Sequence, residues 1–157
     1  MDMLSAIRTC LSKYATFRGR ARRAEFWWFT LFLFIGNMVL TFADSFLFGT
    51  VTTYQGGFDA QTNTPILSGL FLLATFLPSI SVTVRRLHDT GRSGWWYWLW
   101  LVPIVGMILL IIWLASRGTA GPNAYGPDPL DDDAPPDGGD HEAGYVASSV
   151  PTVRRRR

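Results

Sequence analysis

Residues 26–48 read FWWFTLFLFIGNMVLTFADSFLF, an apolar run without Lys or Arg. A helix over this run would be about 34 Å long at about 1.5 Å per residue, enough to span a hydrocarbon core of about 30 Å. Trp27 and Trp28 at its start suit a membrane interface, where the indole N–H stays hydrated. The run is longer than the apolar core of about 7–15 residues in a cleaved signal peptide, so we expect it to remain in the membrane.

Two further apolar runs follow, at residues 66–84 (ILSGLFLLATFLPSISVTV) and 95–115 (WWYWLWLVPIVGMILLIIWLA). A soluble helix or strand would interrupt such runs with polar residues to keep one face hydrated. We therefore predict an all-α polytopic membrane protein with about three transmembrane helices. Pro103 and Gly106 interrupt the third run, so a re-entrant hairpin over 95–115 is an alternative to a straight span.

The ends of the chain differ from this centre. Residues 3–17 place Leu4, Ile7, Leu11 and Tyr14 at helical spacing, which predicts a short amphipathic helix. It lies either flat on the membrane surface or against the protein's own polar loops. Residues 130–157 are rich in Asp, Pro and Gly, a composition typical of disorder. We expect a membrane domain over residues 1–129 and a disordered tail over 130–157.

Basic residues indicate the orientation. Residues 49–65 contain no Lys or Arg, whereas the segments before the first run and between the second and third runs are basic. The positive-inside rule then places the N-terminus and the second connection in the cytoplasm. Three straight spans would put the C-terminus outside, and the hairpin alternative would return it to the cytoplasm.

The first basic motif, FRGRARRAEFW at residues 17–27, leads directly into the first apolar run. Arginine binds phosphate through two N–H groups at once, and a position beside the membrane keeps lipid phosphate within reach. The alternative is a topology signal whose side chains reach toward the interface. A nucleic-acid duplex would have little room to dock here, so we expect no nucleic-acid partner. We expect Glu25 to pair with an arginine of this motif: Arg18, Arg20, Arg22 or Arg23.

The second motif, RRLHDTGRSGWW at residues 85–96, contains several polar groups. The triplet Asp89-Thr90-Gly91 occurs in aspartic proteases, but their chemistry needs two aspartates on facing β-loops. His88 and Asp89 would also suit an acid–base pair. A metal site is unsupported, because the other histidine, His141, lies in the tail. The simplest interpretation is a tight cytoplasmic turn with Arg85, Arg86 and Arg92 facing headgroups.

Three further residues carry polar or reactive groups. Asn37 lies near the middle of the first run and is expected to hydrogen-bond another helix. Asp44, near the outer end, is expected to be hydrated at the interface. Cys10 is the single cysteine, which excludes an internal disulfide and predicts a small apolar packing residue.

Taken in order, three stretches resemble the domain of unknown function 805 family of bacterial inner-membrane proteins. The matching residues are Phe17–Arg20, Arg22–Arg23 and Glu25–Trp27, then Arg85–Asp89, Arg92–Ser93 and Trp95–Trp96, and then Gly118, Gly121, Asn123 and Tyr125–Pro129. Phe26 stands where the family often has tyrosine. The resemblance implies a bacterial inner-membrane location and supplies no established activity.

Our leading hypothesis is a non-enzymatic membrane protein without a cofactor, whose two basic motifs form one cytoplasmic cluster. This cluster would bind anionic lipid headgroups or a membrane-protein partner, which includes a second copy of the chain. One alternative is a transport component whose path is lined by Asn37, Pro78 and the Pro103–Gly106 break. Another is an enzyme that acts on a lipid-linked substrate. The predicted cluster contains Arg18, Arg20, Arg22, Arg23, Arg85, Arg86, His88, Asp89 and Arg92.

Overall fold

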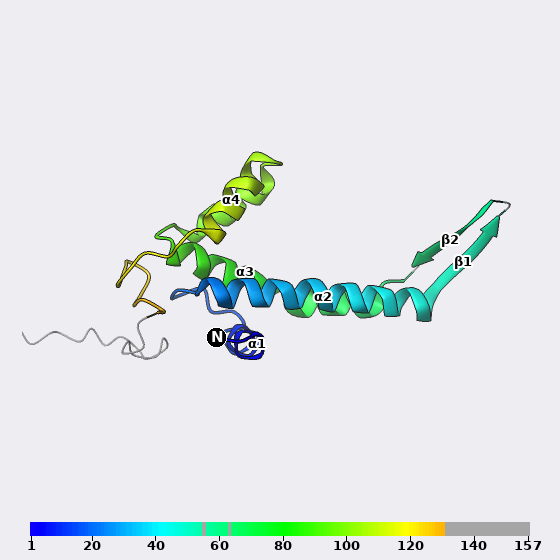
Figure 1. The fold of residues 1–157 in the computed structure, drawn as a ribbon, viewed down its shortest axis with the longest axis horizontal. Coiled ribbons are helices and arrows are strands. Elements are labelled where there is room, and N and C mark those ends of the chain that lie inside the picture. The colour runs from blue at the N-terminus through cyan, green and yellow to red at the C-terminus, as the bar shows by residue number, and fades with distance from the viewer. Residues whose placement is uncertain (55, 63, 131–157) are drawn as a thin grey trace, which may run out of the picture.

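The structure, a computed structural model, describes residues 1–54, 56–62 and 64–130. The predicted disordered tail therefore lies, from residue 131 onward, outside the described residues. Figure 1 shows the arrangement of the elements. In chain order they are α1 (Met3–Ser12), α2 (Arg23–Phe48), β1 (Gly49–Tyr54), β2 (Gly57–Thr62), α3 (Ile66–Asp89), the 3₁₀ helix η1 (Gly94–Leu101) and α4 (Val105–Ala115).

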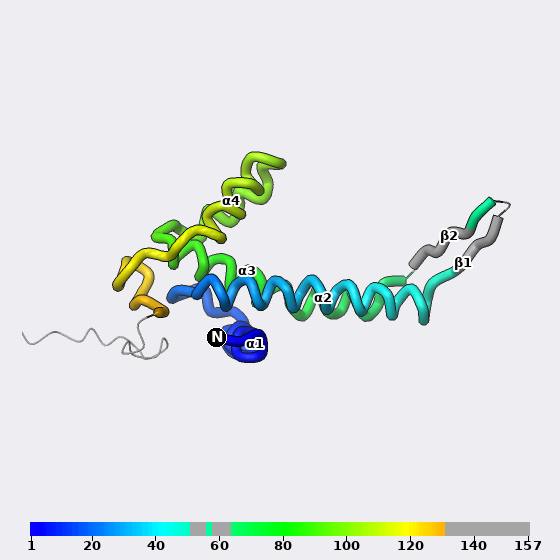
Figure 2. Tube along the Cα trace, viewed as in Figure 1, coloured from blue at the N-terminus to red at the C-terminus, as the bar shows by residue number. Residues whose placement is uncertain are grey.

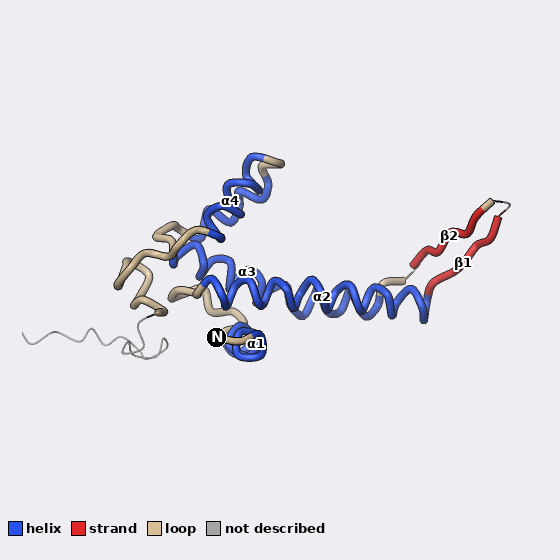
Figure 3. Tube along the Cα trace, in the orientation of Figure 1, coloured by secondary structure: helices blue, strands red, loops and turns tan. Residues whose placement is uncertain are grey.

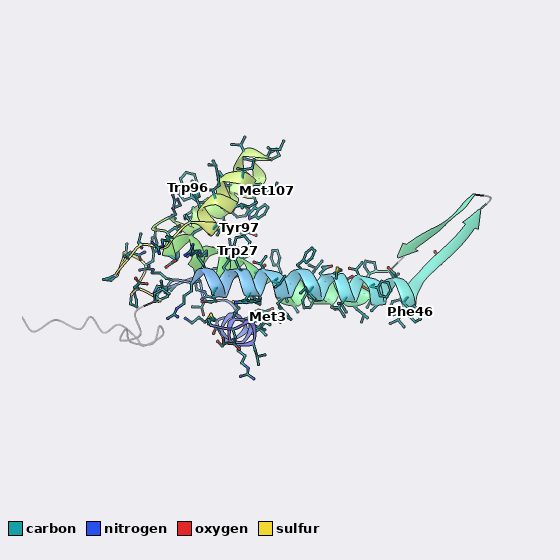
Figure 4. All side chains as sticks on the ribbon, in the orientation of Figure 1. Met3, Trp27, Phe46, Trp96, Tyr97 and Met107 are labelled. Atoms are coloured by element: carbon teal, nitrogen blue, oxygen red, sulfur yellow. The ribbon has the colours of Figure 1, made fainter. Side chains whose placement is uncertain are left out.

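Helices α2 and α3 form an antiparallel pair, side by side along most of their length (Figure 1). Both are long and apolar enough to cross a membrane, by length and composition. Large apolar side chains are exposed along both, for example Phe42 and Phe46 on α2 and Leu73 on α3. Figure 4 shows side chains projecting above and below the α2–α3 pair in this view, with Phe46 labelled on α2. Exposed apolar surface of this extent is typical of a protein that faces lipid.

Pro78 lies inside α3 and cannot donate the hydrogen bond that a helix makes to the residue four positions earlier, Ala74. Another group must therefore satisfy the freed Ala74 carbonyl in an apolar environment. In the structure the Tyr14 hydroxyl, from the segment after α1, donates to the Ala74 carbonyl at 2.7 Å. The proline therefore creates the acceptor that ties this segment to α3.

The connection between α2 and α3 is an antiparallel β-hairpin, with Gly49 opposite Thr62 and Tyr54 opposite Gly57. It extends beyond the helix pair, at the end farthest from α1 and α4 (Figure 3). The sequence analysis predicted only a polar connection here. Its Thr-rich composition is compatible with strands, but these six-residue strands are too short to stand out beside long apolar helices.

The third apolar run is broken, as its Pro–Gly pair suggested. The 3₁₀ helix η1 ends at Leu101, and Ile104, with a φ of 63°, reverses the chain before α4. Gly106 packs so closely on the Leu99 carbonyl that a side chain there would overlap it. The chain consequently folds back as a helical hairpin, and Figure 2 shows it returning to the end where the N-terminus lies. The alternative of a hairpin over 95–115 is therefore the backbone arrangement observed.

Helix α1 ends at Ser12, earlier than the predicted residue 17. It crosses α2 and is seen end-on in Figure 1. Its small residues Ala6 and Cys10 are fully buried against the helix pair, while Leu4 and Leu11 are exposed. The helix thus packs on the protein through Ala6, Cys10 and the partly buried Ile7. The exposed Leu4 and Leu11 are available to a membrane surface.

Candidate functional site

The two basic motifs meet at one end of the helix pair. The Ala21 amide, just before α2, donates to the carbonyl of Arg85 near the end of α3, at 3.1 Å. His88 Nδ1 lies 3.3 Å from the carbonyl oxygen of Gly19. These two contacts link the first basic motif to the second at this end of the helix pair.

Asp89 forms the centre of this site. Arg20 Nε donates to Asp89 Oδ1 at 2.9 Å, and Arg86 pairs with the other carboxylate oxygen, Oδ2. All three side chains are at most 5% exposed. The prediction that Arg86 faces headgroups is therefore wrong. A buried arginine needs a charged partner, and Asp89 provides one to two arginines at once.

Arg86 also fixes the end of the helical hairpin. Its Nε donates to the Leu114 carbonyl at 3.0 Å, and its guanidinium also donates to the carbonyl of Ser116. Leu114 lies in the last turn of α4 and Ser116 directly follows the helix. Carbonyls at this end have no amide partner within the helix, and a cation is favourable there. Arg86 therefore attaches the returning chain to the end of α3.

Arg85 forms a second buried ion pair. Its NH1 donates to Glu25 Oε1 at 2.7 Å, and the guanidinium is fully buried. The predictions that Arg85 faces headgroups and that Glu25 pairs with an arginine of its own motif are both wrong. Glu25 lies one turn into α2 and points toward α3, so the arginine on the neighbouring helix is the nearer partner.

Cys10 lies against this second pair. Its thiol is 3.7 Å from Glu25 Oε1. Burial, reinforced by the negative charge of Glu25, raises the pKa of the Cys10 thiol to about 12. The cysteine is therefore a neutral packing residue, as the sequence indicated.

Residues 116–130 form a strap that folds back over the Arg20–Asp89 pair. Arg20 donates to the carbonyls of Thr119 and Gly121, at 2.5 and 2.6 Å. The Thr119 amide in turn donates to the Asp89 carbonyl at 2.9 Å. Gly118 packs directly on the Asp89 carboxylate, where a methyl group would overlap it. The sequence analysis relied on charge and did not identify the strap. The one indication of the strap in the sequence was the third stretch that matches the family, which contains Gly118 and Gly121.

His88 is covered by the same strap. The ring of Tyr125 stacks on it with a centroid distance of 4.1 Å, and Asn123 donates to the His88 carbonyl at 2.9 Å. Because Asp89 instead faces Arg20 and Arg86, His88 and Asp89 do not form an acid–base pair. In the described part of the chain, no three His, Cys, Asp or Glu side chains gather as a metal site requires.

Two predicted cluster residues lie apart from this network. Arg92 is positioned over the ring of Trp113, 4.5 Å from its centroid, and donates to the Thr90 carbonyl. Arg92 is partly buried, and the aromatic ring of α4 provides a favourable surface for its cation. That it faces headgroups stays a prediction. Arg18 is exposed on the segment between α1 and α2.

A pocket of about 550 Å³ opens beside the Arg20–Asp89 pair. The start of α2 forms one wall, and the strap forms the opposite one. Among the residues described, no side chain caps the N-terminus of α2. Five arginines and two aspartates line the pocket, together with small and apolar residues. The charged residues are Arg20, Arg22, Arg23, Arg86, Arg117, Asp89 and Asp128.

Asp128 holds the strap in shape at the edge of this pocket. A hydrogen bond from the Leu130 amide, assisted by the Gly121 amide and the charge of Arg20, lowers the pKa of the Asp128 carboxyl below its ordinary value. Asp128 is therefore ionised at neutral pH. It lies 3.9 Å from Arg20 NH2, the same nitrogen that lies 2.9 Å from Asp89.

The two intramembrane polar residues lie away from the pocket. Asp44 is fully buried and accepts hydrogen bonds from the amides of Leu67 and Ser68 and from the Ser68 hydroxyl, at 2.7–2.9 Å. The expectation that Asp44 is hydrated is therefore wrong, because it caps the start of α3 from the neighbouring helix. Asn37 is half-buried and accepts from Thr41, on its own helix, at 3.1 Å.

Comparisons with known proteins agree with this arrangement. The family described as "Protein of unknown function (DUF805)" matches residues 14–127. The chain is 42% identical to the inner membrane protein YhaI of Escherichia coli K12 over 119 residues, which cover 76% of this chain and 90% of YhaI. It is 40% identical to the inner membrane protein YhaH of the same strain, over 76% of this chain and 91% of YhaH. The uncharacterised protein YiiR is 31% identical over 74% of this chain and 87% of YiiR.

No solved structure matches the chain. The family match spans both basic motifs and almost the whole strap, and so contains every arginine and aspartate of the pocket except Asp128. The chain belongs to the DUF805 family and is an inner membrane protein.

Proposed function

We propose that this protein binds the phosphate of an anionic lipid headgroup in the arginine-lined pocket. The observation that carries the proposal is the charge of the lining. Five arginines face two aspartates, which leaves a formal surplus of three positive charges. A concave site with such a surplus attracts anions and holds them in a partly dry environment.

The arginines of the pocket divide into two groups. Arg20 and Arg86 are buried and held by Asp89, so they form a rigid floor. Arg23 and Arg117 are exposed at the rim and are not bound to Asp89. Guanidinium groups bind phosphate oxygens in pairs, and the rim arginines are free to approach from two walls. The two buried arginines form a preformed part of the site, and the two exposed arginines can complete it when the ligand binds.

The start of α2 adds to this attraction. Arg22, Arg23 and Ala24 line the pocket, and they flank the N-terminus of a helix of 26 residues. The first amides of a helix have no acceptors within it, and the helix dipole places partial positive charge there. Phosphate groups are common ligands of such positions in proteins. The uncapped start of α2 therefore favours phosphate over a less charged ligand.

A lipid is the favoured source of the phosphate because of where the pocket lies. Trp27 and Trp96 lie at this end of the molecule, as Figure 4 shows, and such residues concentrate at the headgroup level of a bilayer. Helix α1, which crosses α2 here, leaves Leu4 and Leu11 exposed toward a membrane surface. A pocket at the headgroup level of the bilayer lies next to the phosphate groups of the lipids.

The orientation we propose follows from the same features. Helices α2 and α3 each cross the membrane once, and the η1–α4 hairpin enters and leaves from the side of the pocket. The positive-inside rule puts that side, the N-terminus included, in the cytoplasm and the β1–β2 hairpin outside. The pocket then faces the cytoplasmic leaflet, where its charge matches that of anionic lipids.

The experiment compares two double variants with the same loss of charge. Arg23→Gln/Arg117→Gln removes both rim arginines, and Arg8→Gln/Arg18→Gln removes two exposed arginines outside the pocket. We expect the first to weaken binding of short-chain phosphatidylglycerol to detergent-solubilised protein by about tenfold or more, at about 1 kcal/mol per arginine. The second should change it by less than about threefold.

Two further ligands identify the source of the phosphate. Short-chain phosphatidylcholine, whose phosphate is neutralised by choline, should bind more weakly than phosphatidylglycerol. Inorganic phosphate should bind weakly, because it lacks the acyl chains that keep a lipid at this height. Tight binding of inorganic phosphate would assign the pocket to a soluble anion. Equal effects of the two double variants would contradict the proposal.

A further inference from the structure

We propose that the pocket has an intramolecular competitor, the acidic segment Asp131–Asp133 of this same chain. The inference rests on the proposed function, since it concerns the regulation of the same pocket. Leu130, the last described residue, lines the pocket together with five arginines. The next three residues in the sequence are Asp131, Asp132 and Asp133. Asp131 is thus joined by one peptide bond to a residue of the pocket wall, and Asp132 and Asp133 follow it directly.

The charges of the two partners match. The pocket carries a formal surplus of three positive charges, from five arginines and two aspartates. The three aspartates carry three negative charges at neutral pH. Carboxylates form the same paired, charge-assisted hydrogen bonds with guanidinium groups as phosphate does. The segment therefore offers the pocket the chemistry that we assign to the lipid ligand.

The strap already demonstrates this chemistry within the pocket. Asp128, two residues before Leu130, lies 3.9 Å from Arg20 and accepts a hydrogen bond from the Gly121 amide at 2.9 Å. Its carboxylate supports the wall, and among residues 1–54, 56–62 and 64–130 neither Arg23 nor Arg117 forms an ion pair. The next acidic residues in the sequence are Asp131, Asp132 and Asp133, directly after Leu130, and they would supply the negative charge for these rim arginines.

Attachment makes such a competitor effective even if its intrinsic affinity is low. A group tethered by a few residues has a local concentration in the millimolar range or above. A pocket filled by the segment for nine-tenths of the time would bind external lipid about tenfold more weakly than an empty one. Strongly anionic membranes would displace the segment, and weakly anionic ones would not. The segment would thereby set a threshold of lipid charge for binding.

The test neutralises the segment without shortening the chain. Asp131→Asn/Asp132→Asn/Asp133→Asn should raise the affinity for short-chain phosphatidylglycerol by about threefold to tenfold. The matched control, Asp137→Asn/Asp140→Asn/Glu142→Gln, removes the same charge farther along the sequence and should raise it by less. An equal rise in both variants would indicate general repulsion and overturn the inference.

A second comparison separates occupancy of the pocket from long-range repulsion. In the Arg23→Gln/Arg117→Gln background the competitor loses its binding partners, so the same three substitutions should have little effect. A gain that persists undiminished would overturn the inference. If the rim arginines matter for lipid binding and neutralisation brings no gain, the inference fails and the proposed function stands. If the rim arginines do not matter, the proposed function itself fails.

Discussion

Arg20 and Asp89 are 69 residues apart in the sequence and form a buried pair, with Arg20 Nε 2.9 Å from Asp89 Oδ1. This pair connects three segments, because Arg20 precedes α2, Asp89 ends α3, and the strap carbonyls bind the same guanidinium. The floor of the pocket is therefore also the point at which the two basic motifs and the strap are held together.

Removing the charge of Asp89 should destabilise this point strongly. Asp89→Asn leaves Arg86 buried without its counter-charge and leaves Arg20 with the more distant Asp128, at 3.9 Å. Breaking a buried ion pair from one side costs about 3–5 kcal/mol. The midpoint of thermal unfolding in detergent should fall clearly. Asp2→Asn provides the comparison, since Asp2 is exposed and caps α1. Asparagine caps a helix about as well as aspartate, so this variant should lose little stability. Equal losses in both variants would argue against a central role for Asp89.

Gly118→Ala should disturb the pocket without changing any charge. The added methyl group overlaps the Asp89 carboxylate, so the strap must shift away from it. We expect lower thermal stability together with weaker lipid binding. Gly69→Ala is the matched control, because a methyl group there meets nothing within 4 Å, and it should be neutral or stabilising in a helix. An unaffected Gly118→Ala variant would show that the strap is not tightly packed on Asp89.

Tyr14 and Pro78 should be coupled, although they do not bond each other directly. Tyr14→Phe removes the hydroxyl that donates to the Ala74 carbonyl and should cost about 1 kcal/mol. In a Pro78→Ala background the new backbone amide can donate to Ala74, so the cost of Tyr14→Phe should fall. A double-mutant cycle of unfolding free energies measures this coupling. A coupling energy of zero would show that another group satisfies Ala74.

Cys10 should react slowly with maleimide at pH 7–8. Its pKa of about 12 keeps the thiol protonated, and the thiolate is the reactive form. Ser12→Cys, introduced into a Cys10→Ala chain, places an exposed thiol near the end of the same helix and should react much faster. Comparable labelling rates would show that α1 does not stay docked on the helix pair.

Much of the fold was predictable because the bilayer imposes strong constraints on sequence. Long apolar runs must become helices in lipid, so α2 and α3 followed from composition alone. The break in the third run followed from Pro103 and Gly106. The β1–β2 hairpin was missed, since its short strands have no comparable signal.

The site was only partly predictable from the sequence. The charge of a residue indicates the environment that favours it, but it does not identify the residue with which it pairs. Arg85 and Arg86 look alike beside the membrane, yet both are fully buried in ion pairs. Their partners, Glu25 and Asp89, are set by how α2 and α3 pack side by side. Asp44 was misjudged for the same reason, since its role as a cap depends on the position of Ser68 on a neighbouring helix.

Native mass spectrometry of phosphatidylglycerol bound to the detergent-solubilised protein tests the central claim most directly. We predict that the unmodified chain and Arg8→Gln/Arg18→Gln retain one tightly bound lipid, and that Arg23→Gln/Arg117→Gln loses it. Retention of the same lipid by the Arg23→Gln/Arg117→Gln variant would contradict the account.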